Sequence, residues 1–219
     1  MRVAGLIAGC LLVAGCSLLA PLPNRSRFFT LTPLPEALAR RADAPRQAAG
    51  TGDGILYGLG PVKVVAYLDR NEVATRVSPT EVRYSLVDRW AEPLPAAITS
   101  VMLQNLSALL ETDRIVAYPW VGALTIDYQV EVGVLRFETD DKGISELTAR
   151  GAIRDERKSA YVIVKDSTFT RPGPPANATA STTDLSAALG DLSREIATAL
   201  RPLPPPAPEP TPAPRRKRK

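Results

Sequence analysis

Two patterns of apolar residues follow one another between Glu81 and Leu110. In the first, Val82, Tyr84 and Leu86 alternate with polar residues, and this period of two is typical of a half-buried strand. In the second, apolar residues recur every three or four positions and predict the buried face of an amphipathic helix: Leu94, Ile98, Val101, Met102, Leu106, Leu109 and Leu110. The stretch therefore predicts a strand that leads through a short corner into a helix.

Trp90 lies in the corner between these two elements. It is followed by Pro93 and Pro95, which are tolerated in the first turn of a helix because no backbone donor is needed there. We expect the indole ring to pack in the core, because large aromatic side chains contribute much buried area. The alternative is that Trp90 is a surface anchor for a partner protein.

Shorter apolar runs predict further strands. We expect them at Phe28 to Thr32, Val62 to Ala66, Glu72 to Val77 and Arg114 to Tyr118. Residues 35–53 have no large apolar residue after Leu38, and they are predicted to form a flexible loop that starts with a helical turn over residues 36–41. Residues 69–71 predict a turn.

The second half of the chain predicts an antiparallel meander. Residues 124–134 alternate strictly, and the apolar phase then slips by one residue beside Gly133, which indicates a β-bulge. A turn at residues 140–143 leads to a returning strand from Leu147 to Ile153. The apolar run from Tyr161 to Val164 then predicts a strand that is buried on both faces.

A second amphipathic helix is predicted to start near residues 181–183. Its apolar positions lie on one face: Leu185, Leu189, Leu192, Ile196 and Leu200. Together these elements predict a single α+β domain over residues 28–200. We expect a mainly antiparallel twisted sheet with two amphipathic helices packed on it.

The first residues form a leader. Arg2 precedes an apolar run, which is the order of regions in a signal peptide, here residues 1–15. Val13-Ala14-Gly15-Cys16 resembles the lipobox of bacterial lipoproteins, in which the cysteine is diacylated and becomes the mature N-terminus. We therefore expect lipidation of Cys16 and a spacer over residues 16–27, and the alternative is an ordinary cleaved signal. By resemblance to lipoprotein sorting signals, Ser17 favours the periplasm-facing side of the outer membrane.

The other end of the chain is a Pro-rich basic tail. Eight of the 21 prolines lie between residues 202 and 214, so residues 201–219 are expected to be disordered, with a basic tip. The leader and the tail hold seven of the 27 basic residues, whereas Glu209 is the one acidic residue outside the central part, out of 23. The centre therefore carries a net charge of −2, from 20 basic and 22 acidic residues. A nucleic-acid-binding domain would carry its basic residues on the fold, so none is expected.

The composition also limits the chemistry. The sequence contains no histidine, and its two cysteines are Cys10 and Cys16 at the N-terminus. We therefore expect neither a catalytic residue nor a metal site, and no cofactor apart from the acyl groups on Cys16. A hydrolase that uses only carboxylates remains formally open, and clustered carboxylates with raised pKa values would favour it.

Several short motifs resemble the ABC-type transport auxiliary lipoproteins, a PqiC-like family. The resemblance extends over roughly residues 28–200, and its specific segments are Arg89-Trp90-Ala91-Glu92-Pro93-Leu94 and Tyr118-Pro119-Trp120, with support from the lipobox, residues 28–33, residues 67–70 and Asn105-Leu106. It implies an outer-membrane lipoprotein that is not an enzyme and that docks a periplasmic MCE-domain protein and an ABC permease, which together move phospholipids or related lipids between the membranes. The alternative is a lipoprotein that binds lipid alone or serves outer-membrane assembly, and a deep apolar cavity would favour it.

Loops on a rigid scaffold are the usual place for binding residues. Besides Trp90, the candidate contact residues for a partner are therefore Asp69, Arg70, Asn71, Asp140 and Lys142. An MCE partner is, by the same resemblance, a ring or tube of several subunits. We therefore expect a homo-oligomer of more than two subunits, closed by a repeated heterologous interface.

Overall fold

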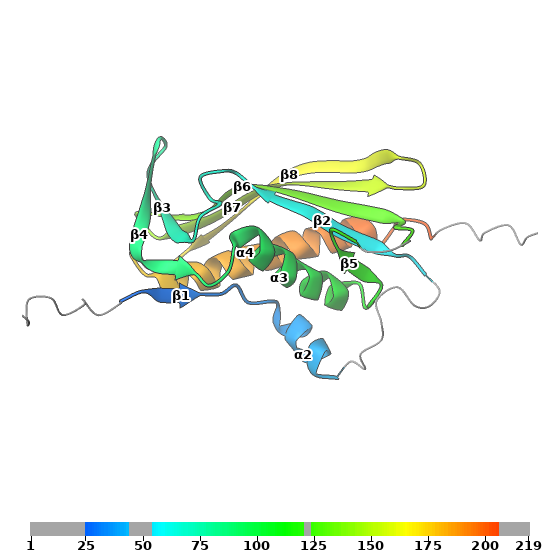
Figure 1. Cartoon of the computed structure of the whole chain (residues 1–219), viewed down its shortest axis with the longest axis horizontal. Helices are drawn as coiled ribbons and strands as arrows, with labels where there is room; N and C mark the ends of the chain where they lie inside the picture. Colours follow the sequence, from blue (N-terminus) through cyan, green and yellow to red (C-terminus); the bar gives the residue numbers. More distant parts are fainter. Residues whose placement is uncertain (1–24, 44–53, 121–123, 206–219) are drawn as a thin grey trace, which may run out of the picture.

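The computed structural model describes residues 25–43, 54–120 and 124–205. The leader, Cys16, most of the spacer, the second half of the predicted loop at 35–53 and most of the basic tail lie outside these residues. The described chain enters the fold at one end of an elongated molecule and leaves it at the other (Figure 1).

The described residues form eight strands and three helices. In chain order these are β1 (Arg27–Phe29), α2 (Pro35–Asp43), β2 (Tyr57–Val64), β3 (Glu72–Ser78), β4 (Glu81–Trp90), α3 (Leu94–Leu109), β5 (Ile115–Ala117), β6 (Tyr128–Asp140), β7 (Ile144–Asp155), β8 (Ala160–Pro172) and α4 (Ala178–Leu200). The two long amphipathic helices and the strand–corner–helix unit confirm the sequence prediction. The helical turn expected after residue 35 is a nine-residue helix.

Strand β6 is the centre of the sheet. It pairs with β7 in antiparallel orientation along its length, while its other edge is shared by β2 and β3, which both run parallel to it. Strands β1 and β4 are also parallel, as are β2 and β5. The α+β prediction is confirmed, but the sheet is mixed. Parallel strands need a long crossover connection, and the chain between β2 and β6, which contains α3, supplies it. The alternation of apolar and polar residues does not show whether two strands pair in parallel or antiparallel orientation, so the prediction of a mainly antiparallel sheet missed these pairs.

The helices cover one face of the sheet. Helix α3 packs on β2, α4 packs on β7 and β8, and α2 lies outside α3 (Figure 1). The core between these layers contains the predicted apolar faces of both long helices, including Ile98, Met102, Leu106, Leu189 and Leu192, each 0–1% exposed. Among the described residues, no helix covers the opposite face of the sheet.

The corner at Trp90 joins three strands. The indole is 5% exposed, and its ring centroid lies 6.0 Å from that of Phe137 on β6. The backbone N–H of Trp90 donates to the carbonyl of Asn71 at 2.6 Å, and the next N–H, of Ala91, donates to Phe29 of β1 at 2.9 Å. The ring therefore packs in the core, as the first of the two interpretations expects.

Leu86 differs from the prediction. It was expected on the buried side with Val82 and Tyr84, but it is 91% exposed. The reason is an irregularity in the β3–β4 pairing, where Glu72 pairs with Arg89 and Ala74 pairs with Tyr84, so that four residues of β4 face one residue of β3. Such an insertion changes the side to which the following side chains point.

Strand β8 also differs from the prediction. Tyr161, Val162 and Val164 are 56%, 42% and 59% exposed, although this run was expected to be buried on both faces. The strand is at the edge of the sheet, and the residues of its outer face have no layer above them. A short apolar run does not distinguish a central strand from an edge strand.

Several boundaries are shifted. Strand β2 spans Tyr57–Val64 rather than residues 62–66, β8 continues to Pro172, and β6 begins at Tyr128 rather than at residue 124. The predicted slip of phase after Val134 is confirmed by a register shift at Leu135. Helix α4 begins at Ala178, about one turn earlier than predicted, because the side chain of Asn177 accepts a hydrogen bond from the N–H of Ala180 and caps the helix.

Replacement of Trp90 by alanine tests the corner. We expect Trp90→Ala to lower the free energy of unfolding by about 3–5 kcal/mol, since the cavity left by a buried aromatic cannot collapse fully. Leu86→Ala is the matched control on the same strand, and it should change the stability by no more than about 0.5 kcal/mol. Thermal melts measure both, and an unchanged melting temperature for Trp90→Ala would exclude the core role.

Candidate functional site

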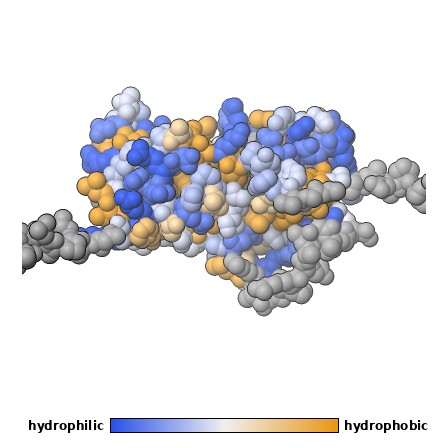
Figure 2. All heavy atoms as spheres, in the orientation of Figure 1, coloured by the Kyte–Doolittle hydropathy of each residue, from blue (hydrophilic) through white to orange (hydrophobic). Residues whose placement is uncertain are grey.

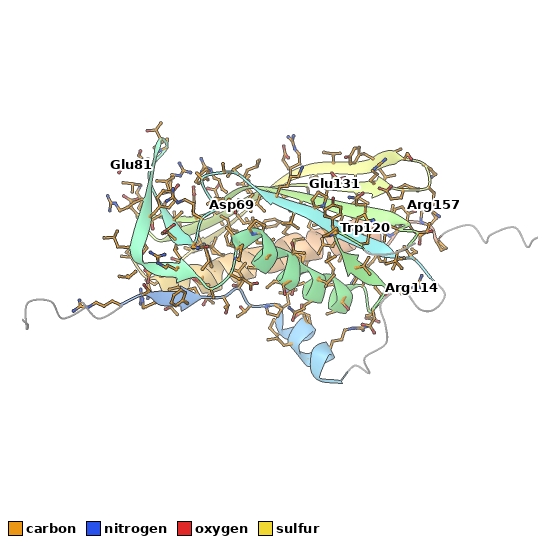
Figure 3. The ribbon with its side chains drawn as sticks, viewed as in Figure 1. Asp69, Glu81, Arg114, Trp120, Glu131 and Arg157 are labelled. Atoms are coloured by element: carbon orange, nitrogen blue, oxygen red, sulfur yellow. The ribbon has the colours of Figure 1, made fainter. Side chains whose placement is uncertain are left out.

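The turn at residues 69–71 directly precedes β3 and is held in place (Asp69 in Figure 3). Asp69, Arg70 and Asn71 are exposed. The guanidinium of Arg70 lies 4.5 Å from the ring centroid of Tyr84, and its Nε is 3.4 Å from the Glu72 carboxylate. The turn therefore presents its polar groups from a fixed position beside β4, as a contact surface requires.

The second predicted turn lies beside the end of β3. The Oδ1 atom of Asp140 accepts hydrogen bonds from the N–H groups of Lys142 and Ile144 at 3.0 and 2.7 Å. The N–H of Asp141 donates to the carbonyl of Arg76 on β3 at 3.1 Å. Asp140 thus stabilises the turn, while the side chain of Lys142 is exposed.

The structure brings the candidate residues to one half of the molecule, but not into one pocket. An open cavity of about 560 Å³ is bordered by Phe28, Asn71, Trp90 and Glu92. A separate groove of about 360 Å³ runs between the β3–β4 hairpin, the turn that contains Asp140, and the start of α4. Both hollows are wide enough for side chains of a partner.

A charged cluster on the helix-free face was not found from the sequence. Arg76 Nε donates to Glu138 at 2.7 Å, and Arg76 Nη2 donates to the Tyr67 hydroxyl at 3.1 Å. The Tyr67 hydroxyl in turn donates to the carbonyl of Leu135 at 3.3 Å. Burial, followed by the neighbouring Glu138 carboxylate, raises the pKa of Tyr67 to about 12. These residues come from three segments, so no local spacing in the sequence could indicate the cluster.

The Glu138 side chain is 2% exposed, whereas other ion pairs on this face are solvated. Arg150 and Asp166, for example, form a pair at 2.7 Å with side chains that are 61% and 53% exposed. Exposed pairs contribute little to stability, whereas an unpaired buried carboxylate is costly. The Arg76–Glu138 pair is therefore the ion pair that fixes β3 against β6.

The carboxyl pKa shifts that are resolved among the described residues do not point to a general acid. Where a shift of a carboxyl pKa is resolved, its direction is downward: Glu36, Glu72, Asp155, Asp166 and Glu195. At Asp155 burial would raise the pKa, but the hydrogen bond from Arg157 and further contacts of Arg157 and Lys158 outweigh it. A catalytic acid at neutral pH needs the opposite shift.

Other kinds of site are also limited. Within residues 25–43, 54–120 and 124–205, no group of three or more acidic residues is close enough to hold a metal ion. No helix in these ranges combines the length and the hydropathy needed to cross a membrane. A cavity between β7, β8 and α4 with a largely apolar lining, which includes Val130, Ile163 and Leu192, has a volume of about 40 Å³. Sites for small molecules typically have at least about 300 Å³.

The comparisons with known proteins identify relatives of this chain. The family model described as "ABC-type transport auxiliary lipoprotein component" matches residues 37–197. A crystal structure of an uncharacterized protein is 16% identical and superposes with a TM-score of 0.62, covering 80% of this chain and 97% of its own. A protein from Xanthomonas campestris, assigned to the DUF330 family, is 19% identical with a TM-score of 0.55 and covers 78% and 92%. No curated protein matches the sequence. At these identities the two structures show a shared fold.

Removal of Arg76 tests the charged cluster. Arg76→Ala leaves the Glu138 carboxylate buried without its partner, and we expect the free energy of unfolding to fall by about 2–3 kcal/mol. This is less than for a fully enclosed pair, because water can enter the vacated site. Arg150→Ala removes an exposed partner and should leave the melting temperature nearly unchanged. Urea titrations of both variants measure the difference, and equal effects would show that the Arg76 pair is also solvated.

Proposed function

This chain belongs to the family of ABC-type transport auxiliary lipoproteins, and from that premise we propose that it is the outer-membrane docking subunit of an intermembrane lipid transport system. The family is an auxiliary component of transport and not an enzyme. In the proposal, acylated Cys16 anchors the protein in the periplasm-facing leaflet of the outer membrane. The folded domain then binds a periplasmic MCE-domain protein, which an ABC permease serves from the inner membrane.

Within the described residues, the strongest support for docking, rather than for lipid carriage by the protein itself, is the small volume of the apolar cavity beside α4. The space of about 40 Å³ beside α4 is far below the volume that an acyl chain needs. The larger hollows also present polar side chains, Asn71 and Glu92 in one and Asp140 and Asn177 in the other, although the second has more apolar than polar lining. These hollows suit side chains of a protein partner better than a lipid tail. We therefore place the lipid pathway in the partner.

The candidate contact surface is built on β3 and its neighbours. The turn at residues 69–71 precedes this strand, and the turn that contains Asp140 and Lys142 hydrogen-bonds beside its end. Rigid turns lose little conformational entropy on binding, which favours affinity. The groove between the β3–β4 hairpin, the turn that contains Asp140 and the start of α4 would receive side chains of the partner.

Fractionation of cells tests the anchor and the docking together. The wild-type protein is expected in the outer-membrane fraction, and solubilisation should co-purify it with the MCE protein and the permease. Cys16→Ser should release the protein to the soluble periplasm, because two acyl chains supply the stable attachment. Cys10→Ser is the matched control and should change nothing. An acylated protein that recovers no MCE partner after mild cross-linking would contradict docking while leaving the anchor intact.

We also propose that the protein forms a homo-oligomer of more than two subunits. Strand β8 supports this, because its 13 residues pair with β7 on one side and leave the other edge free within the described chain. A long free edge with exposed apolar residues favours association. Repetition of one heterologous interface around an axis would close a ring that matches a ring-shaped partner.

Light scattering on the Cys16→Ser protein measures the assembly. We expect the measured mass of the Cys16→Ser protein to exceed that of two chains and to fall on dilution. At the same concentration, the additional change Val164→Lys should lower the mass, because it places a charge in the contact between subunits at β8. Glu81→Ala, at an exposed position of the β3–β4 hairpin, is the control. The mass of one chain at every concentration would exclude the ring.

A further inference from the structure

The irregular part of β4 exposes a large apolar residue in a rigid setting. Leu86 is 91% exposed and the adjacent Val87 is 37% exposed. Residues 85–88 are the insertion that lacks partners in β3. They form the bulge, a name used below for these four residues.

Hydrogen bonds fix the conformation of the bulge. The Ser85 hydroxyl oxygen accepts from the N–H groups of Val87 and Asp88 at 3.3 and 2.9 Å. The hydroxyl donates to Asp88 Oδ2 at 3.1 Å, and Asp88 Oδ1 accepts from Arg27 Nε at 2.7 Å. The exposure of Leu86 is therefore a consequence of a defined structure rather than of a frayed end.

The bulge lies where the chain enters the fold. Strand β1 runs parallel to the end of β4, with Arg27 beside Asp88 and Phe28 beside Arg89. Phe28 is 63% exposed. Figure 2 shows apolar residues at this end of the molecule, among hydrophilic ones. The acylated end of the chain is thus tied, through the Arg27–Asp88 pair, to the segment that exposes Leu86.

The spacer between Cys16 and β1, called the tether below, limits how far the bulge can be from the membrane. Eleven residue steps separate Cys16 from Arg27. A fully extended chain spans at most about 3.3–3.6 Å per residue, so Arg27 lies within about 40 Å of the acylated cysteine. A folded domain on so short a tether repeatedly contacts the bilayer, and its nearest end is the one that contains β1 and the bulge.

The chemistry of this end suits a bilayer surface. An exposed leucine gains free energy when it enters the boundary between headgroups and acyl chains. Arg83, three residues before Leu86, is exposed, and the Arg27 side chain is 57% exposed. An arginine can keep its charge among lipid phosphates while neighbouring apolar groups enter the acyl region. The carboxylate within the bulge, that of Asp88, is paired with Arg27.

We propose that the bulge is a second membrane contact, in which Leu86 inserts into the leaflet that holds the acyl chains of Cys16. This inference rests on the acylation that the proposed function assumes. Two contacts on either side of a short tether orient the domain. They hold the β1 end at the membrane, so the groove that Ser85 and Asp88 help to line lies next to the bilayer, where the partner would bind it, and the end with Arg157 points away (Figure 3).

A single fluorescent probe can test this contact. After removal of the leader and acylation of Cys16, the chain has no free thiol, because its two cysteines are Cys10 and Cys16. Leu86→Cys therefore accepts one thiol-reactive, environment-sensitive dye in the acylated protein. Val164→Cys is the matched control, since Val164 is also exposed but lies on β8. Both labelled proteins are reconstituted into vesicles of phosphatidylethanolamine and phosphatidylglycerol.

We expect the emission of the dye at position 86 to shift to the blue, and nitroxides at shallow acyl positions to quench it, whereas the dye at position 164 stays as in water. A dye at Val87→Cys should also be shifted, and the additional change Leu86→Asp should abolish that shift. Emission as in water at position 86 of an acylated, reconstituted protein would overturn the inference and leave the anchor standing. A shift that occurs only after addition of the MCE protein would assign the bulge to a protein contact instead. If Cys16 retains a free thiol and the protein does not bind to the vesicles, the proposed lipid anchor is wrong, and the inference that rests on it fails as well.

Discussion

The buried amide of Asn105 is the interaction on which the arrangement of the chain depends. Its side chain is 0% exposed on α3. Its oxygen accepts from the N–H of Leu34 at 2.8 Å, and its nitrogen donates to the Ser193 hydroxyl of α4 at 3.2 Å. One amide therefore joins the N-terminal segment and both long helices. A buried amide without these partners would be costly, so the three segments can pack together in few other ways.

This junction also determines where the proposed membrane anchor meets the fold. The N–H of Thr32 donates to the Ser186 hydroxyl of α4, and Leu34 packs over Gly190, where an added Cβ would lie 2.5 Å from the Leu34 side chain. Small residues on α4 thus let the N-terminal segment cross the helix closely. The crossing fixes β1 beside β4, and with it the end of the molecule from which the proposed lipid tether would extend. In the proposed arrangement, the polar junction in the core would therefore set the orientation of the domain at the membrane.

Features encoded by local periodicity could be predicted from the sequence, and features encoded by distant pairing could not. The amphipathic faces of α3 and α4 repeat over several turns, so the elements and their buried sides were evident. The exposure of Leu86 depends on how β4 pairs with β3, and that of Val164 depends on which strand is last in the sheet. The Arg76–Glu138 pair joins residues 62 positions apart. No window of neighbouring residues contains that information.

The two exposed apolar features missed by local periodicity have different physical meanings. Strand β8 exposes its apolar residues at an edge that pairs with no other strand of the described chain and is available to another strand, although its pairing with β7 is irregular at Val162. The bulge of β4 exposes Leu86 without a free edge of comparable length, and Ser85 satisfies two of its backbone donors. A surface with satisfied backbone groups gains little from strand pairing but still gains from burial of the leucine side chain. This difference is why we assign the edge to subunit association and the bulge to the bilayer.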